Sequence, residues 1–203
     1  MDTDQGKVIN IGVSSQPIDQ LNNHALVFFL FEDSLLTGKI PVMIDRILDG
    51  IIMRSVKVGR IKGKYGETTL VASEGRIQSP KILFIGLGET SLHTPKRIKE
   101  SATILLETLT KINIFNFATF LPDIMAPDYD YAKTIEGFIE GLIEGLISID
   151  FTSEEVLYVT IVDEQRRLKD TITVLNRGTF AHHDRVRVLF TQNDLGQETI
   201  TLS

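Results

Sequence analysis

Apolar positions along the chain follow two spacings, and each spacing predicts a type of element. Continuous or alternating apolar runs indicate strands, whereas apolar residues three and four positions apart indicate helices. The expected strands cover 7–13, 25–31, 55–61, 68–72, 81–85, 114–120 and 156–162. The expected helices cover 41–53, 95–109, 131–148 and 163–177, and residues 186–191 could form one more strand before a polar tail.

The run at residues 25–31 is apolar at every position, which is typical of a strand covered on both faces. Helical segments alternate with the strands from residue 81 onward. The pattern therefore predicts an α/β fold in which a mixed central sheet is flanked by helices in three layers. No linker rich in proline, glycine or serine divides the chain, so we expect residues 1–203 to form a single domain.

A strand, a loop and a helix follow one another where the first candidate site lies. Gly86 and Gly88 end the strand, and Thr94 stands as an N-cap before the proline that begins the helix. The N–H groups of such a loop can bind an anion, and Lys96 and Arg97 add positive charge. The alternative is that the glycines only turn the chain.

A four-residue repeat in the helix predicted at 131–148 places Gly137, Gly141 and Gly145 in one stripe. Each glycine costs up to about 1 kcal/mol relative to alanine inside a helix, so a close contact must compensate. We expect the stripe to dock on the protein's own sheet. The alternative is a helix–helix contact between subunits.

The composition and charge of the chain exclude some classes of binding partner. The 203 residues are 42% hydrophobic, and 27 acidic against 21 basic residues give a net charge of −6, which disfavours nucleic acid. No stretch approaches the roughly 18 apolar residues of a membrane span, and the acidic N-terminus differs from a signal peptide. We therefore expect a cytoplasmic protein without nucleic-acid or membrane partners.

Motifs for catalysis or metal binding are missing from the sequence. It holds no cysteine, no serine completes a G-x-S-x-G motif, and the one histidine cluster, His182-His183-Asp184, lacks the spacing of a zinc helix. That cluster is better explained as a solvated turn. We therefore expect no catalytic residue, no metal site and no cofactor.

The order of several segments resembles the N-terminal domain of leucyl (cytosol) aminopeptidases. The similar segments are Phe31-Glu32-Asp33, the turn at 63–68, the strand leading into Gly86-Leu87-Gly88, Leu121-Pro122, and the helix bearing Glu136-Gly137. The resemblance covers residues 7–162. Residues 163–203, with a helix, a further strand and a polar tail, begin like the connection toward the catalytic domain of that family.

The resemblance implies a macro-like fold without peptidase chemistry. In that family two metal ions are held by a C-terminal domain marked by an Asn-Thr-Asp-Ala-Glu-Gly-Arg string. The sequence Ser73-Glu74-Gly75-Arg76 echoes part of this string but lacks the preceding aspartate, so we interpret it as coincidence. No catalytic residue of the family is therefore assigned to a position in this chain, and we expect it not to be an enzyme.

Two functions follow as expectations. The first is a stand-alone relative of the aminopeptidase N-terminal domain that acts as a non-catalytic binding or assembly module, with a second copy or an aminopeptidase-like chain as partner. The second is a macro-like domain that binds ADP-ribose, a nucleotide or another phosphate-bearing small molecule at the Gly86 to Gly88 loop. The Asn-Ala-Ala-Asn stretch and the Gly-Gly phosphate loop of macro domains are both missing, which weighs against the second function.

Overall fold

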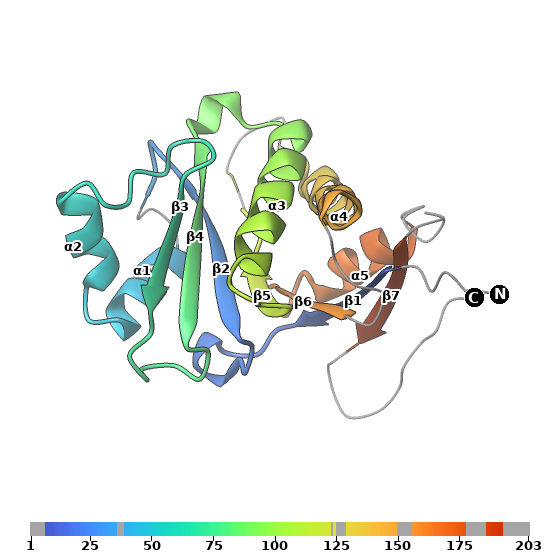
Figure 1. The fold of residues 1–203 in the computed structure, drawn as a ribbon, viewed down its shortest axis with the longest axis horizontal. Coiled ribbons are helices and arrows are strands. Elements are labelled where there is room, and N and C mark those ends of the chain that lie inside the picture. Colours follow the sequence, from blue (N-terminus) through green and yellow to red (C-terminus); the bar gives the residue numbers. More distant parts are fainter. Residues whose placement is uncertain are drawn as a thin grey trace.

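We describe the chain from a computed structural model, which covers residues 7–35, 39–122, 124, 129–149, 156–177 and 186–192 (Figure 1). The strands in these ranges are β1 (Lys7–Ser14), β2 (Ala25–Phe31), β3 (Thr68–Ala72), β4 (Lys81–Gly88), β5 (Asn116–Phe120), β6 (Val156–Val162) and β7 (Val186–Gln192). The α-helices are α1 (Lys39–Ile47), α2 (Ile51–Lys57), α3 (Pro95–Thr110), α4 (Tyr131–Ser148) and α5 (Leu168–Arg177). Short 3₁₀ helices lie at Ile18–Gln20 (η1) and Thr90–Leu92 (η2).

One mixed sheet organises these elements in the order β3-β4-β2-β5-β6-β1-β7. All neighbouring strands run parallel except β3, which pairs antiparallel with β4. Helices α3, α4 and α5 pack on one face, while α1 and α2 lie on the other, beside β4 and β2 (Figure 1). The predicted α/β architecture, a mixed sheet flanked by helices, is confirmed.

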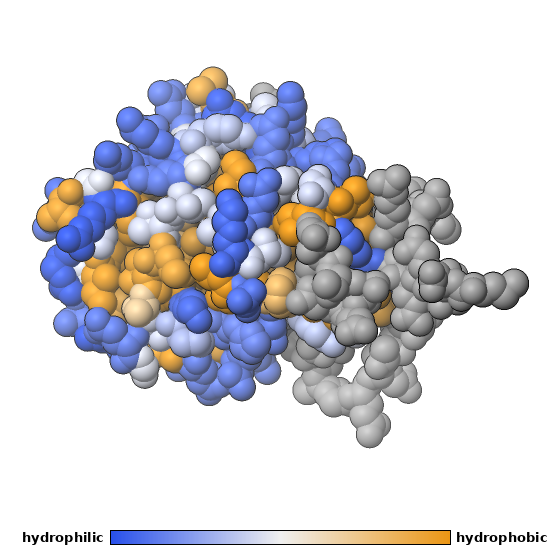
Figure 2. Space-filling view, in the orientation of Figure 1, coloured by the Kyte–Doolittle hydropathy of each residue, from blue (hydrophilic) through white to orange (hydrophobic). Residues whose placement is uncertain are grey.

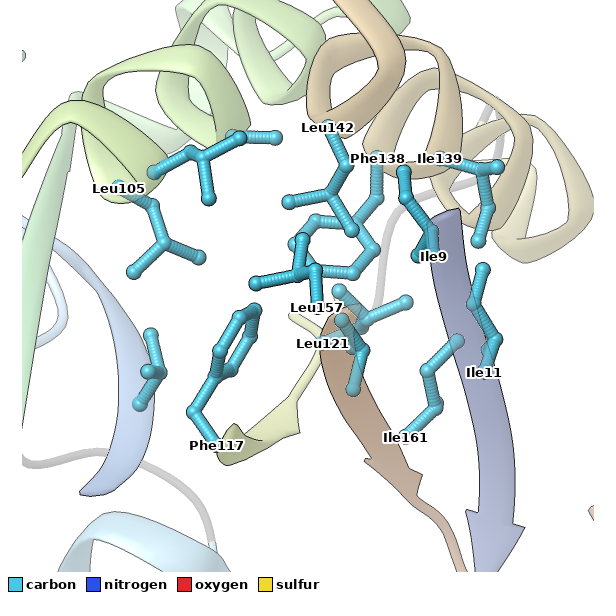
Figure 3. Packing of buried hydrophobic residues seen from close by; sticks show 14 of the residues in the cluster. Ile9, Ile11, Leu105, Phe117, Leu121, Phe138, Ile139, Leu142, Leu157 and Ile161 are labelled. Carbon is cyan, nitrogen blue, oxygen red and sulfur yellow. The ribbon is translucent and has the colours of Figure 1, made fainter. Parts of the chain in front are cut away.

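The larger hydrophobic core lies between the sheet and helices α3 and α4. Phe117 of β5, Leu105 of α3 and Leu142 of α4 are fully buried there and converge in the close view of Figure 3. All seven residues of β2 are buried, as its unbroken apolar run predicts. A second core lies under α1 and α2 on the opposite face and includes Ile44 and Leu48.

Two predicted elements between residues 41 and 61 are wrong. The helix expected at 41–53 is two helices, because Asp49 and Gly50 adopt φ values of 54° and 74° and break the backbone between them. The strand expected at 55–61 begins inside α2 and continues as a turn. Its β-branched and charged residues fit either state, and β3 rather than this segment pairs with β4.

The glycine stripe of α4 packs against α3 of the same chain. A Cβ atom added to Gly137 would lie 2.7 Å from the carbonyl oxygen of Pro95, and one added to Gly141 would lie 2.1 Å from that of Lys99. Lys99 also forms ion pairs of 3.2 Å and 2.9 Å with Glu140 and Glu144, two glutamates of the same repeat.

This contact corrects both expectations for the stripe. The three glycines are buried. Gly145 is the least crowded, with the Leu106 Cδ2 atom 3.2 Å from an added Cβ. The stripe packs on a helix and not on the sheet. Because α3 covers Gly137, Gly141 and Gly145, another subunit cannot contact them. Close approach of two helix backbones explains why the repeat carries glycine.

Replacing Gly141 with alanine should destabilise the fold. The added Cβ would overlap a backbone oxygen, so the helices must separate, and we expect Gly141→Ala to lower the free energy of unfolding by about 1–3 kcal/mol. Gly145→Ala is the matched control, because its Cβ would meet the end of a flexible leucine and alanine favours the helix. Urea unfolding measures both. A more stable Gly141→Ala variant would show that the helix contact is loose.

Candidate functional site

The carboxyl ends of the parallel strands form the edge of the sheet where a site is expected. After β2 the chain passes through α1 and α2 to β3, which lies toward one edge of the sheet. After β5 it passes through α4 to β6, which lies toward the opposite edge. The strand order therefore reverses direction between β2 and β5. In open α/β sheets, ligands bind in the crevice outside such a switch point.

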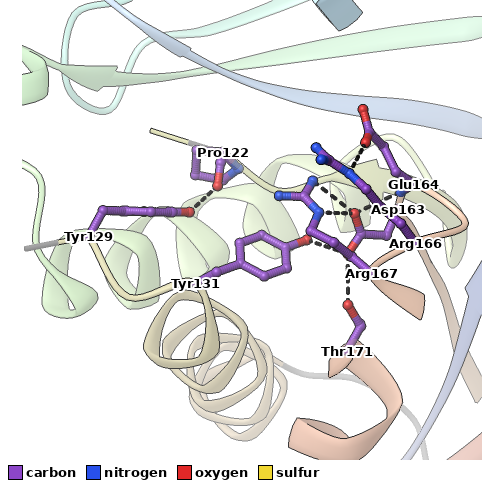
Figure 4. A network of polar contacts seen from close by, with 8 residues as sticks. All are labelled: Pro122, Tyr129, Tyr131, Asp163, Glu164, Arg166, Arg167 and Thr171. Carbon is purple, nitrogen blue, oxygen red and sulfur yellow. Dashed lines mark hydrogen bonds and ion pairs between the residues drawn. The ribbon is translucent and has the colours of Figure 1, made fainter. Parts of the chain in front are cut away.

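A buried carboxylate organises this edge. The side chain of Asp163, directly after β6, is fully buried and accepts hydrogen bonds from the Tyr131 hydroxyl at 3.0 Å and the Thr171 hydroxyl at 2.7 Å (Figure 4). Its other oxygen accepts from the Glu164 N–H at 2.8 Å and from the Arg167 guanidinium at 2.9 Å. Asp163 thus joins the start of α4 to the start of α5.

Tyr131 is held protonated as a donor within this network. Burial raises the pKa of its hydroxyl above the ordinary value of 10.0, and the Asp163 carboxylate raises it further. The guanidinium carbon of Arg167 lies 4.6 Å from the centre of the Tyr131 ring. The aromatic ring and the cation therefore fix each other's position in front of the buried carboxylate.

A cleft opens beside this network, between the first turns of α4 and α5. Its volume is about 560 Å³. Carboxylates, cations, tyrosines and aliphatic side chains all contribute to its walls. The lining residues are Tyr129, Asp130, Tyr131, Ala132, Lys133, Ile135, Arg167, Asp170 and Val174. A cleft of this size and mixed chemistry can hold a small polar molecule.

A row of aromatic rings leads from the cleft to the switch point. Tyr131 and Tyr129 have ring centroids 6.5 Å apart, His93 lies 5.9 Å from Tyr129, and Phe31 at the end of β2 lies 5.4 Å from His93. Both ring nitrogens of His93 are buried and lack a hydrogen-bond partner among the described residues. Burial, and secondly the charge of Arg97, lower the pKa of His93 below 6.5.

The loop that we expected to bind an anion uses its donors within the chain. The Gly86 N–H donates to the Glu67 carbonyl at 2.8 Å, and the Gly88 N–H donates to the Gly63 carbonyl at 2.9 Å. A Cβ atom on Gly86 would lie 2.0 Å from the Lys64 oxygen. The glycines thus admit the neighbouring turn at 63–66, and their two N–H groups are not free to donate to an anion.

The remaining residues of that expected site lie at the start of α3. The Thr94 hydroxyl caps the helix by accepting from the Arg97 N–H at 3.2 Å, as predicted. The Arg97 guanidinium lies 4.8 Å from the centre of the Tyr65 ring and donates to the Leu87 carbonyl at 3.4 Å. Lys96 is 82% exposed and 3.7 Å from Glu100, so of this set it has the cation most open to solvent.

The sequence that echoes the aminopeptidase string lies in the turn between β3 and β4. Glu74 adopts a φ of 53°, and its carboxylate pairs with Arg76 at 2.5 Å. Among the described residues, no three acidic or histidine side chains gather as metal ligands would. The cluster His182-His183-Asp184 lies outside the described residues.

Sequence reasoning missed the polar network and the cleft. A signal was present, because Asp163 follows a buried strand directly and Arg167 stands one helical turn later. Tyr131, however, is 32 residues away from Asp163 in the chain and joins the two residues only through the fold.

No helix among the described residues is long and apolar enough to cross a membrane.

Sequences of cytosol aminopeptidases are similar to this chain. The model of the cytosol aminopeptidase family, N-terminal domain, matches residues 27–151. The probable cytosol aminopeptidase of Alkaliphilus oremlandii is 35% identical over 85 residues, which cover 41% of this chain and 17% of that protein. That of Haemophilus ducreyi is 22% identical over 117 residues, covering 58% and 23%. The matches thus span about a fifth of each relative.

Solved structures share the fold. A mutant of tomato leucine aminopeptidase superposes with a TM-score of 0.63 at 14% identity, over 83% of this chain and 35% of that one. The Trypanosoma brucei macrodomain, solved in complex with ADP-ribose, gives a TM-score of 0.64 at 14% identity, over 83% and 69%. The Mycobacterium tuberculosis DarG macrodomain gives 0.58 at 12% identity, over 76% and 98%. The macro-like fold is therefore confirmed.

Acidification should destabilise the protein through His93. Because its pKa is lowered in the folded state, the unfolded chain binds the proton more readily, and the free energy of unfolding falls as the pH drops through 6.5 toward the lowered value. We expect His93→Phe to reduce this loss between about pH 7.5 and pH 5.5 in urea unfolding. His24→Phe, at an exposed histidine, should retain it. An unchanged pH dependence in His93→Phe would contradict the assignment.

Proposed function

The chain belongs to the cytosol aminopeptidase family through the N-terminal domain of that family, and from this membership we propose that it acts as a non-catalytic binding module. The observation that carries the binding role is the cleft between α4 and α5. A row of aromatic rings joins it to the switch point of the sheet, its mixed charges suit a polar ligand, and Asp163 fixes two of its walls. We also propose a cytoplasmic location.

The non-catalytic role rests on which part of the family the chain matches. The matched residues 27–151 correspond to the N-terminal domain, and curated relatives are matched over only 16% to 23% of their length. A two-metal hydrolase needs several carboxylates converging on one pocket. Glu74, the carboxylate in the sequence that echoes the catalytic string, is exposed in a turn and paired with Arg76.

Binding of ADP-ribose or a nucleotide is the second candidate. It draws on the Trypanosoma brucei macrodomain, whose structure contains ADP-ribose and whose fold is shared. The N–H groups of Gly86 and Gly88 already donate within the chain, so we place the phosphate of this candidate at Lys96 and the start of α3 instead. Lys133 lines the cleft and Lys96 lies at the start of α3, so substituting each lysine in turn distinguishes the two sites.

The purified chain should not release leucine from a leucyl peptide. We expect no hydrolysis above background with zinc, manganese or cobalt supplied, measured by the liberation of free leucine. A full-length cytosol aminopeptidase serves as the positive control. Metal-dependent release that is abolished by Glu74→Ala would refute the non-catalytic assignment.

A small polar ligand of the cleft should raise the melting temperature. A ligand present at about 100 times its Kd stabilises the folded state by about 2.7 kcal/mol. We would screen ADP-ribose, ADP, inorganic phosphate and leucine at millimolar concentration by thermal shift. Lys133→Ala should reduce the shift and Lys96→Ala should not.

These two variants are matched, because both lysines are exposed near the start of a helix and each has one nearby carboxylate. Lys133 lies 3.6 Å from Asp130, and Lys96 lies 3.7 Å from Glu100. A shift lost only in Lys96→Ala would move the site to α3 and favour the second candidate. No shift with any of the four probes would remove the small-molecule role of the cleft.

A further inference from the structure

The strand β3 lies at one end of the sheet order, and one of its edges has no neighbouring strand among the described residues. It pairs antiparallel with β4 on its other side. The Ser73 N–H, just after β3, donates to the Pro80 carbonyl at 3.0 Å, so the backbone groups of the odd-numbered residues point toward β4. Alternate residues of an antiparallel pair point away from the partner strand. The N–H and C=O groups of Thr68, Leu70 and Ala72 therefore lie along the free edge.

This edge is open to solvent and lacks two common protections against strand pairing. Thr68, Leu70 and Ala72 are exposed, and Leu70 is 47% exposed. β3 contains neither a proline nor a charged residue, both of which discourage another chain from pairing with an edge strand. Figure 2 shows hydrophobic surface in the part of the molecule where β3 lies. An edge of this kind can accept an extended segment as a further strand.

A group of exposed cations precedes β3 in the chain. Residues 50–66 contain five basic residues and no acidic one, although the whole chain has a net charge of −6. We call the last four of them the basic turn, and none of the four forms an ion pair with another described residue. The basic turn consists of Lys57, Arg60, Lys62 and Lys64, all of them exposed.

Hydrogen bonds place the basic turn beside the start of β3. The Thr69 hydroxyl donates to the Arg60 carbonyl at 3.4 Å. The N–H groups of Lys62 and Gly63 donate to the carboxylate of Glu67, the residue before β3, at 2.9 Å and 2.7 Å. Backbone donors thus occupy the carboxylate next to the turn. A segment on the free edge would therefore meet positive charge at the end where β3 begins.

We propose that the free edge of β3 binds an extended acidic segment of a partner protein. The segment would add to the sheet as a strand beside Thr68–Ala72, with an apolar side chain next to Leu70 and its carboxylates at the basic turn. Charge complementarity at the basic turn supports an acidic partner. A membrane surface or a nucleic acid could pair with the cations, but neither has a peptide backbone that continues the sheet.

A second copy of this chain fits the free edge less well. If two β3 strands paired antiparallel about a two-fold axis, the basic turn of one copy would lie near the turn at 73–76 of the other. The carboxylate in that turn belongs to Glu74, which is already paired with Arg76 at 2.5 Å. The second copy therefore offers the basic turn no free carboxylate there.

Two short peptides test the proposal without involving the cleft. Each joins three glutamates to alternating valine and threonine, with the glutamates at the N-terminus for parallel addition or at the C-terminus for antiparallel addition. Fluorescence anisotropy should show that one of them binds the full chain, and more weakly as salt is added. A peptide with lysine in place of each glutamate should bind at least about tenfold more weakly.

Substitutions and hydrogen exchange locate the bound peptide. The Leu70 N–H should exchange more slowly when the peptide is bound, as measured by NMR. Leu70→Pro should abolish binding and keep the fold, checked by circular dichroism, because an edge strand tolerates proline where the N–H faces solvent. Lys62→Glu should weaken binding about fivefold. Lys169→Glu is the matched control, since it makes the same charge change at an exposed residue of α5, and it should bind normally.

Several results would overturn the proposal. They are an absence of binding by both acidic peptides at millimolar concentration, equal binding of the lysine peptide, and binding that survives Leu70→Pro in a folded chain. Vesicles that contain phosphatidylserine and bind Leu70→Pro as well as the unaltered chain, when neither peptide binds, would assign the basic turn to a membrane surface. A dimer that Leu70→Pro dissociates would place a second copy on the edge.

Discussion

The close contact of α4 on α3 sets the position of every other feature at the carboxyl edge of the sheet. Gly137 lies against the carbonyl of Pro95, the first residue of α3, so α3 begins beside the second turn of α4. This brings Tyr129, just before α4, onto His93, just before α3. A pair of larger residues along the stripe would separate the helix starts and open the aromatic row between them.

Local signals in the sequence predicted much of this fold, because they depend on neighbouring residues only. The apolar run of β2 and the threonine cap of α3 are of this kind. The glycine stripe shows the limit: periodicity identifies the stripe, but a helix backbone and a sheet demand the same small residues. The break at Gly50 was missed because its left-handed backbone leaves no mark on the apolar spacing.

The candidate site was harder to predict than the fold, because hydrogen-bond partners far apart in sequence decide it. Gly86 and Gly88 look alike whether their N–H groups face a ligand or, as here, the turn at 63–66. Conversely, Asp163 and Arg167 read as ordinary surface charges until the fold brings Tyr131 to them. Buried polar groups are informative only once their burial is known.

The place of β1 in the sheet affects the timing of folding during synthesis. β2 pairs with β4, and β4 with β3, all within a short stretch of chain, whereas β1 pairs with β6 and β7, with Val8 opposite Val156. At about 5–20 residues per second, the ribosome needs on the order of ten seconds or more to supply that partner. During this interval β1 lacks its partner strands, so the nascent chain is exposed to misassociation there until β6 is translated.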